Sequence, residues 1–499
     1  MRSLKYCLIL LLSLCLFSCA DVNRNLEEMI PSTSRGVVRI DVRSVLQKGA
    51  ILDKEGNVTI PPQLREAIDA TDGDSPVSDF FSLVKKIGLD TDACLYGFIP
   101  QSIFSYATLV ALDDADVARA EIEKRMGQKF QQIEKVDFLR SGATSYVIDG
   151  DVLFMGVEAK EMADAHLALA ARSYLHKSEP GIETDEAITE ALHKENDVNA
   201  YFSMKGIQKM IAASETISEK VKKFPILTLF TDSDIKALSL HMNFQPEGAM
   251  IEACIKADAK SDYCTLLEAT MAKADASFLK VIPTSMNFIL SLSVKGENLM
   301  KLDQIKKSVN LLSNLPAMDR LDFRSIVAAI DGPLAVAISS GDGMNLSSIA
   351  DDNWNVAIAA KTRNSAAIVQ RIVDFAGEMG QDDYVKNGRH LFSYEGMPVY
   401  LGEQDGVVYA IRLDHELEEE FYYDVPDVKE RFASSPFGFY AKIQNPKGDA
   451  FLNFGFNSPT EAGGMFYSLQ ESNPVVTFLS ILCQASAKAD EDTASDSLY

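Results

Sequence analysis

Two Ser-x-x-Lys stretches carry the residue types and the spacing that would suit a reaction. Ser82 precedes Lys85 in the first, and Ser277 precedes Lys280 in the second. This spacing places both side chains on one face of a helix, where the amine could take the hydroxyl proton and activate the serine as a nucleophile. The Lys-Thr-Gly motif that accompanies such a pair is missing, because arginine follows the Lys-Thr pair at Lys361. We therefore interpret Lys85 as a solvated helix lysine.

The other candidates for catalysis or metal binding are dispersed. No two of the six histidines have the spacing of a helical metal pair: His166, His176, His193, His241, His390 and His415. Four aspartates crowd a glycine-containing loop, but their order does not match the helix-loop-helix calcium pattern: Asp69, Asp72, Asp74 and Asp79. We expect no catalytic residue, no cofactor and no metal ion. The alternative is a hydrolase whose residues meet only in space.

The apolar leader ends in Leu16-Phe17-Ser18-Cys19 and gives the most specific chemical signal. Arg2 and Lys5 precede an apolar run from Leu8 to Phe17, which is shorter than the roughly 20 residues that cross a bilayer. The four residues resemble the lipobox of bacterial lipoproteins. That resemblance implies cleavage before Cys19, a diacylglycerol on its thiol and an acyl chain on its amine. More than one chain gives a stable anchor.

The remaining composition limits the partners. The 499 residues carry 48 basic and 72 acidic side chains, a formal net charge of −24. Loss of Arg2 and Lys5 with the leader makes the mature chain −26 (−24 − 2). An acidic body is repelled by phosphate backbones and anionic headgroups, so we expect no nucleic-acid binding and membrane contact through the lipid alone. Four cysteines follow Cys19 without a Cys-x-x-Cys motif, and we interpret them as dispersed thiols: Cys94, Cys254, Cys264 and Cys483.

The apolar runs behind the leader predict short strands, hairpins and helices whose order occurs twice. Asp149-Gly150 and Asp405-Gly406 each lie between two apolar runs and predict hairpins. In the first half a strand at 94–99 precedes a helix at 117–126, and we expect a long helix at 158–175. Runs in the second half repeat this order at separations of roughly 240 to 256 residues, which favours a diverged duplication.

We therefore predict an α+β protein of two tandem related lobes, each a mainly antiparallel sheet with helices packed on one face. The expected divisions follow the chain in order: a signal peptide at 1–18, a lipid anchor and tether at 19–33, a first repeat at 34–275, a second repeat at 276–485 and an acidic disordered tail at 486–499. Thr493 and Ser497 in the tail resemble O-glycosylation sequons of exported Bacteroidota proteins; an unmodified acidic tail is the alternative.

The lipobox, the Val37-Val38-Arg39-Ile40-Asp41 strand and the repeated body resemble a family of Bacteroidota lipoproteins known as a domain of unknown function. The resemblance implies an outer-membrane lipoprotein and transfers no active site. We expect a non-enzymatic binding or structural role toward an envelope protein or an extracellular ligand. A periplasmic chaperone-like factor is a further alternative. The sparse acidic residues behind Cys19 favour the periplasmic face over the cell surface.

Overall fold

The computed structural model groups the chain into two compact units. Unit 1 contains residues 1–210, 237–249 and 472–499, and unit 2 contains residues 211–236 and 250–471. The structure describes residues 22–53, 58–69, 88–213, 235–257, 264, 267–268, 271–301, 306, 321–339, 355–394, 396–417, 420–443, 450–458, 460–468 and 473–480. Each unit is described by itself below.

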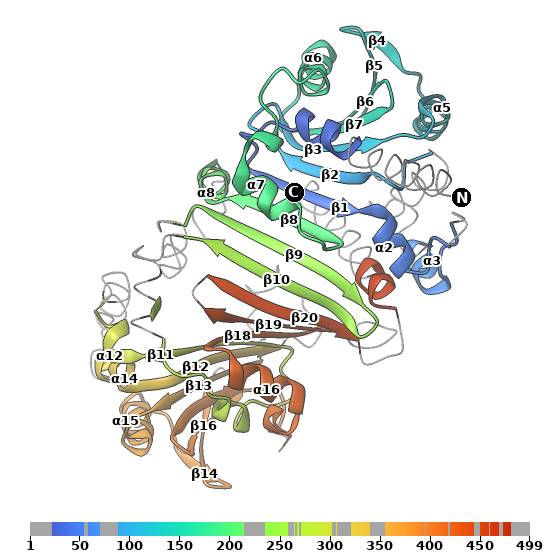
Figure 1. Cartoon of the computed structure of the whole chain (residues 1–499). Helices are drawn as coiled ribbons and strands as arrows, with labels where there is room; N and C mark the ends of the chain where they lie inside the picture. Colours follow the sequence, from blue (N-terminus) through green and yellow to red (C-terminus); the bar gives the residue numbers. More distant parts are fainter. Residues whose placement is uncertain are drawn as a thin grey trace, which may run out of the picture. The chain divides into compact units, whose positions relative to one another are not determined.

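Unit 1 is built on an antiparallel sheet, drawn in blue to green in Figure 1. The strands follow one another across the sheet in this order: β4 (Gln131–Ile133), β5 (Val136–Ser141), β6 (Thr144–Asp149), β7 (Val152–Glu158), β3 (Phe104–Ala111), β2 (Cys94–Ile99), β1 (Gly36–Asp41), β8 (Val198–Ser203) and β9 (Ala237–Gln245). The N-terminal strand β1 therefore lies inside the sheet, between β2 and β8. The helix α8 (Met204–Ala213) follows β8 directly.

Helices cover both faces of this sheet. On one face, helix 22–29, α6 (Asp164–Leu175), the 3-10 turn η1 (Ile182–Thr184) and α7 (Glu186–Leu192) enclose an aromatic core. The opposite face is packed by four further helices: α2 (Val42–Lys48), α3 (Pro62–Asp69), α5 (Ala115–Met126) and helix 474–480. Successive side chains of a strand point to opposite faces, so Leu153 joins the second core while Phe154 joins the first. The α+β class is confirmed, and the structure adds this second helical layer.

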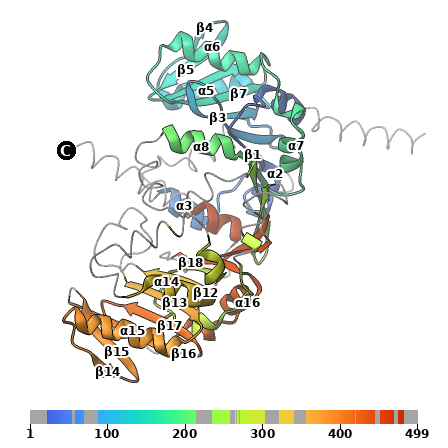
Figure 2. The same ribbon diagram turned by 90° about the vertical axis from the view of Figure 1, so that its left-hand side faces the viewer.

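Unit 2 repeats the plan on its own sheet. Its strands run in the order β14 (Tyr384–Lys386), β15 (Arg389–Tyr394), β16 (Met397–Gln404), β17 (Val407–Arg412), β13 (Asn355–Thr362), β12 (Ile330–Ser339), β11 (Phe288–Lys295), β18 (Phe437–Ile443), β19 (Ala450–Ser458), β20 (Glu461–Ser468) and β10 (Gly248–Lys256). One core lies under η2 (Ser277–Lys280), η4 (Tyr422–Asp424) and α16 (Pro426–Ser434). On the other face α15 (Ser365–Glu378) packs on β16 and β17, as Figure 2 shows. The short helices α12 (Gly296–Leu299) and α14 (Phe323–Ala329) lie between β11 and β12 along the chain.

The pairing register also recurs. Arg39 of β1 faces Tyr96 and Asn199, and Ser291 of β11 faces Ala335 and Gly438 in the same way. Isolated bridges before these strands correspond as well, Pro31 with Gly181 and Pro283 with Phe421. This is the pattern that a duplicated ancestor would leave, and the duplication and the ranges 34–275 and 276–485 stay predictions.

Two predicted elements differ in detail. The helix expected at 158–175 begins only at Asp164, because β7 continues to Glu158 and pairs there with Phe104. The Asp149 hairpin turns on Gly150 and Asp151, with Gly150 at φ 57°, whereas Asp405 and Gly406 both have positive φ. Both hairpins are present, since each turn puts glycine where a left-handed conformation is needed.

Candidate functional site

Residues 22–29, expected as part of a tether, form a helix that belongs to the body of unit 1. Leu26 and Ile30 are fully buried in the aromatic core, with Met29 beside them. The Asn23 side-chain oxygen accepts a hydrogen bond of 2.7 Å from the backbone N–H of Cys94 at the start of β2. The apolar residues of this segment recur at helical spacing, so its burial stabilises it against the sheet.

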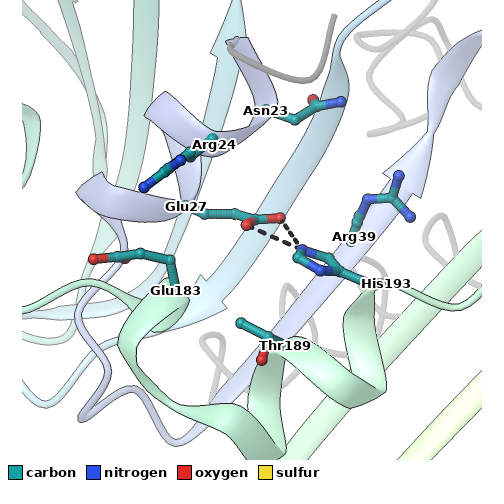
Figure 3. Close-up of a pocket in the computed structure, with 7 residues that line it drawn as sticks. All are labelled: Asn23, Arg24, Glu27, Arg39, Glu183, Thr189 and His193. Atoms are coloured by element: carbon teal, nitrogen blue, oxygen red, sulfur yellow. Dashed lines mark hydrogen bonds and ion pairs between the residues drawn. The ribbon is translucent and has the colours of Figure 1, made fainter. Parts of the chain in front are cut away.

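Glu27 projects from this helix into the protein and is only 4% exposed. The Tyr96 hydroxyl donates to Glu27 Oε1 over 2.7 Å. His193, which ends α7, places Nε2 at 2.9 Å from Oε1 and 3.1 Å from Oε2 (Figure 3). The His193 side chain is 54% exposed, so it connects a buried carboxylate to the solvent-facing side of the site. A buried carboxylate needs such donors, because it loses its hydration.

The floor below Glu27 is a row of polar side chains that crosses four strands. Tyr96, Arg39, Asn199 and His241 face one another in register on β2, β1, β8 and β9. The Arg39 Nη1 group donates to the Leu192 backbone oxygen at the end of α7 over 3.2 Å. His241 Nδ1 lies 2.8 Å from the Asn199 side-chain oxygen. Since the Asn199 amide nitrogen donates to the Lys194 oxygen, we assign the imidazole proton to Nδ1.

Burial sets the protonation states in this row. It raises the pKa of the Cys94 thiol to about 11 and also raises the pKa of Tyr96, to which the Glu27 charge adds. It lowers the pKa of His241 to about 4, so the imidazole is neutral at pH 7. Burial by itself also lowers the pKa of Arg39. Electrostatic interactions with Cys94, Tyr96 and Asp41 outweigh this effect, so the pKa of Arg39 is raised. The row therefore holds one fixed positive charge among neutral groups.

A cavity of about 450 Å³ opens above Glu27, and we call it the Glu27 pocket. All of its lining side chains are polar or charged: Asn23, Arg24, Glu27, Arg39, Glu183, Thr189 and His193. Figure 3 shows the Glu27–His193 contact in the middle, with Arg39 and Asn23 on one side and Arg24 and Glu183 on the other. Gly181 permits η1 to lie this close, since a Cβ there would come within 2.6 Å of the Glu28 Cα.

This arrangement suits recognition better than nucleophilic attack. A carboxylate that orients an imidazole is half of a general-base system, and the other half is a nucleophile beside the ring. Thr189 lies one turn before His193, but its hydroxyl donates to the Asp185 and Glu186 carbonyl oxygens at 3.1 Å. Its proton is thus directed along its own helix. Arg39, His193 and Arg24 line the cavity with nitrogen groups of the kind that donate to anionic groups.

The candidates from sequence do not converge on this site, apart from His193. Lys280 pairs with Asp405, and the Ser277 hydroxyl is buried without a hydrogen-bond partner, so this Ser-x-x-Lys pair forms no dyad. Three other histidines pair singly with aspartates: His176 with Asp149, His390 with Asp383 and His415 with Asp414. Among the described residues no group of three His, Cys, Asp or Glu side chains could hold a metal ion.

Several predicted positions lie outside the described residues: Cys19, Ser82, Lys85, Asp72, Asp74, Asp79, Cys483, Thr493 and Ser497. Their assignments stay predictions. Cys94, Cys254 and Cys264 are thiols, and Cys94 and Cys264 are buried.

Sequence reasoning missed Glu27, Arg39 and Tyr96. Two signals were present: Arg39 interrupts an otherwise apolar strand, and Glu27 lies next to the apolar Leu26 on a segment with helical spacing. A charged residue inside a buried element needs a partner, and that requirement points to a site.

Comparisons with known proteins identify the family to which the chain belongs. Residues 26–495 match the family described as domain of unknown function DUF4836, and the chain belongs to that family. No curated protein matches the sequence. Among solved structures, crystal form III of a protein titled TP0453 matches at 10% identity over 47% of this chain and 80% of that one, with a TM-score of 0.30. Crystal form I of TP0453 matches at 12% identity over 46% and 78%, also with a TM-score of 0.30. No helix in the described ranges is long and apolar enough to cross a membrane.

Proposed function

We propose that this protein is a lipid-anchored envelope protein that binds a small anionic ligand in the Glu27 pocket without converting it. The observation that carries the proposal is the buried Glu27–His193–Tyr96 contact beside Arg39, which places the Arg39 and His193 side chains next to an open cavity. Fixed donors lower the ordering cost of binding a ligand group that complements them. The volume is in the range of small-molecule sites.

The expected anchor supports a position close to a membrane surface. Only two residues lie between Cys19 and Val22, where the helix that lines the pocket begins, so Val22 is the third residue after Cys19. Even fully extended, three residues reach about 10 Å. An acylated Cys19 would therefore hold the Glu27 pocket near the lipid headgroups, on the periplasmic face of the outer membrane under this proposal.

Fractionation of the producing bacterium tests the anchor. We expect Cys19→Ala to release the protein from the membrane fraction and to stop incorporation of labelled palmitate. Cys15→Ala is the matched control, since it changes the other cysteine near the end of the leader and should leave both readouts unchanged. A membrane-bound Cys19→Ala protein that still incorporates palmitate contradicts the proposal.

Thermal unfolding with succinate and with glutamate tests the pocket. We expect at least one of these compounds to raise the unfolding temperature, because binding to the folded state stabilises it by mass action. Arg39→Gln should abolish the shift, and Arg43→Gln, an exposed arginine of α2 paired with Asp92, should retain it. Absence of any shift, or an equal shift in both variants, contradicts the binding site.

A hydrolase is the second candidate, favoured by the contact between the Glu27 carboxylate and the His193 imidazole. Acyl-ester and phosphoester chromogenic substrates distinguish it. If the protein is a hydrolase, the wild type turns over one of these substrates and His193→Gln abolishes the turnover. His166→Gln, on the exposed side of α6, is the control and should keep it. This result would overturn the non-enzymatic assignment.

A further inference from the structure

A second cavity, of about 610 Å³, lies in unit 2 at the position that corresponds to the Glu27 pocket. The registers and bridges of the two units fix the correspondence, since Pro283 and Phe421 pair as Pro31 and Gly181 do. Counting from these bridges aligns the lining residues of the two cavities: Asn23 with Asp275, Arg24 with Ala276, Glu183 with Tyr423, Thr189 with Lys429 and His193 with Ala433.

The polar network around Glu27 has no counterpart at the corresponding positions of unit 2. Glu27 corresponds to Leu279, which is fully buried, and Ala433 takes the place of His193. Phe432 packs on Gly438, which corresponds to Asn199, where a Cβ would lie 2.4 Å from its ring. The second cavity therefore has no counterpart of the Glu27–His193 contact, and its charged groups are the lysines and aspartates that line it.

Four lysines surround the rim, and we call this cavity the lysine pocket: Lys273, Lys280, Lys361 and Lys429. Asp275 and Asp331 are the acidic lining residues, which leaves a formal charge of +2 (4 − 2) in a chain whose net charge is −24. A positive concavity on such an acidic protein concentrates field lines and attracts anions.

Two of the ammonium groups converge on one aromatic ring. Lys429 Nζ lies 3.7 Å from the centre of the Tyr423 ring, and Lys280 Nζ lies 5.1 Å from it. Lys280 also pairs with Asp405, and Lys361 pairs with Asp275. Within the described ranges Lys429 has the ring as its partner and no carboxylate, so its charge is available to a ligand.

We propose that the lysine pocket binds a small ligand that carries a phosphate group. Lysine binds phosphate as a point charge, and the four lysines reach the pocket from four segments, the chain before η2, η2 itself, β13 and α16. Such an arrangement surrounds a tetrahedral oxyanion better than a planar carboxylate, which favours in-plane donors. The cavity exceeds the size of inorganic phosphate, so the ligand has further atoms, which pack on Tyr423 and the alanines that line the cavity.

Calorimetric titration of the full-length protein with pyrophosphate, in buffer of fixed ionic strength, tests the proposal. We expect one saturable site, weakened at least tenfold in the double variant Lys273→Gln/Lys429→Gln. Lys429→Arg should retain most of the affinity, since it keeps the charge over Tyr423. Lys386→Gln is the matched control, because it removes the same charge from the exposed strand β14 of the same unit, where Lys386 pairs with Glu416. It should change affinity less than twofold.

Three results would overturn the proposal: no saturable binding, equal weakening by Lys386→Gln, or tighter binding of citrate than of pyrophosphate. Circular dichroism of each variant checks folding, and the single variant Lys429→Gln replaces the double variant if the latter unfolds. Arg39→Gln should leave pyrophosphate binding unchanged. The titration of Arg39→Gln distinguishes binding in the lysine pocket from binding in the Glu27 pocket, so failure of one proposal does not imply failure of the other.

Discussion

At the scale of single residues, the buried carboxylate of Glu27 depends on its two donors. The Tyr96 phenol keeps its proton because burial raises its pKa, so it can act as a donor at every physiological pH. The His193 ring supplies the second contact from the solvent side. In unit 2 the corresponding residue is Leu279, which needs no donors, and the residue corresponding to Tyr96 is Ala335. At these positions unit 2 therefore lacks both the carboxylate and the tyrosine that donates to it.

Tyr96→Phe should therefore lower the free energy of unfolding by about 1 to 2 kcal/mol, since it removes one donor from a buried carboxylate. Urea denaturation measures the change. Tyr384→Phe, on an exposed tyrosine of β14, is the control and should have no measurable effect. Equal stabilities of Tyr96→Phe and wild type would show that the Glu27 carboxylate does not depend on this hydroxyl.

The lowered pKa of buried His241 predicts how the free energy of unfolding depends on pH. His241 is 1% exposed, and burial lowers its pKa from 6.5 to about 4. Between these values the unfolded chain binds the proton and the folded chain does not, so stability rises with pH. The contribution, up to about 3 kcal/mol, is complete above pH 6.5 and is lost as pH falls toward 4.

Urea denaturation at pH 7 and pH 5 measures this contribution. His241→Gln removes the titrating group and should flatten the dependence between these values. Exposed His166→Gln is the control and should leave the slope as it is in the wild type. A slope unchanged by His241→Gln would show that other groups cause it.

At the scale of elements, a second buried carboxylate fastens α2 to the sheet of unit 1. Asp197, which is 2% exposed, accepts hydrogen bonds from the Ser44 hydroxyl at 2.5 Å, from Lys48 Nζ at 2.7 Å and from the Phe244 backbone N–H at 2.6 Å. Two of these donors belong to α2, and Phe244 belongs to β9. The packing of α2 thus depends on a side chain that directly precedes β8.

Asp197→Ala should lower the free energy of unfolding by about 1 to 3 kcal/mol, since it leaves the Ser44 hydroxyl and the Phe244 N–H without their acceptor, whereas Lys48 keeps the Asn243 side-chain oxygen at 2.7 Å. Lys48→Met alone should cost less, because Ser44 and Phe244 still satisfy the carboxylate. In a double-mutant cycle by urea denaturation, the two changes should be less than additive. Strict additivity would mean that Lys48 and Asp197 do not interact.

At the scale of the whole molecule, net charge predicts behaviour at a lipid surface. Without its acyl chains, the acidic chain should be repelled by anionic headgroups. We expect Cys19→Ala protein to remain in the supernatant after centrifugation with phosphatidylglycerol vesicles at low salt. Salt-sensitive sedimentation with the vesicles would reveal a basic surface strong enough to overcome the net charge and would contradict this expectation.

The sequence by itself determined strands such as those at 37–41 and 94–99, the two hairpins, the α+β class and the family resemblance. These follow from local patterns: alternating apolar residues, glycine at turns and a short leader that ends in cysteine. The helix predicted at 117–126 begins two residues earlier, at Ala115 after the Asp114 N-cap, and ends as predicted at Met126, before the left-handed Gly127.

Tertiary structure alone decided the two pockets. Glu27, Arg39 and His193 are separated by up to 166 positions in the chain, and they meet because β1 pairs between β2 and β8. No local pattern encodes that pairing. Helix 22–29 is likewise stabilised by burial against strands that are distant in sequence. The sequence predicted a tether for this segment, and the structure shows that it lines the Glu27 pocket. The balance between solvation and burial is set by the whole fold, and for that reason a carboxylate's role cannot be assigned from its neighbours in sequence.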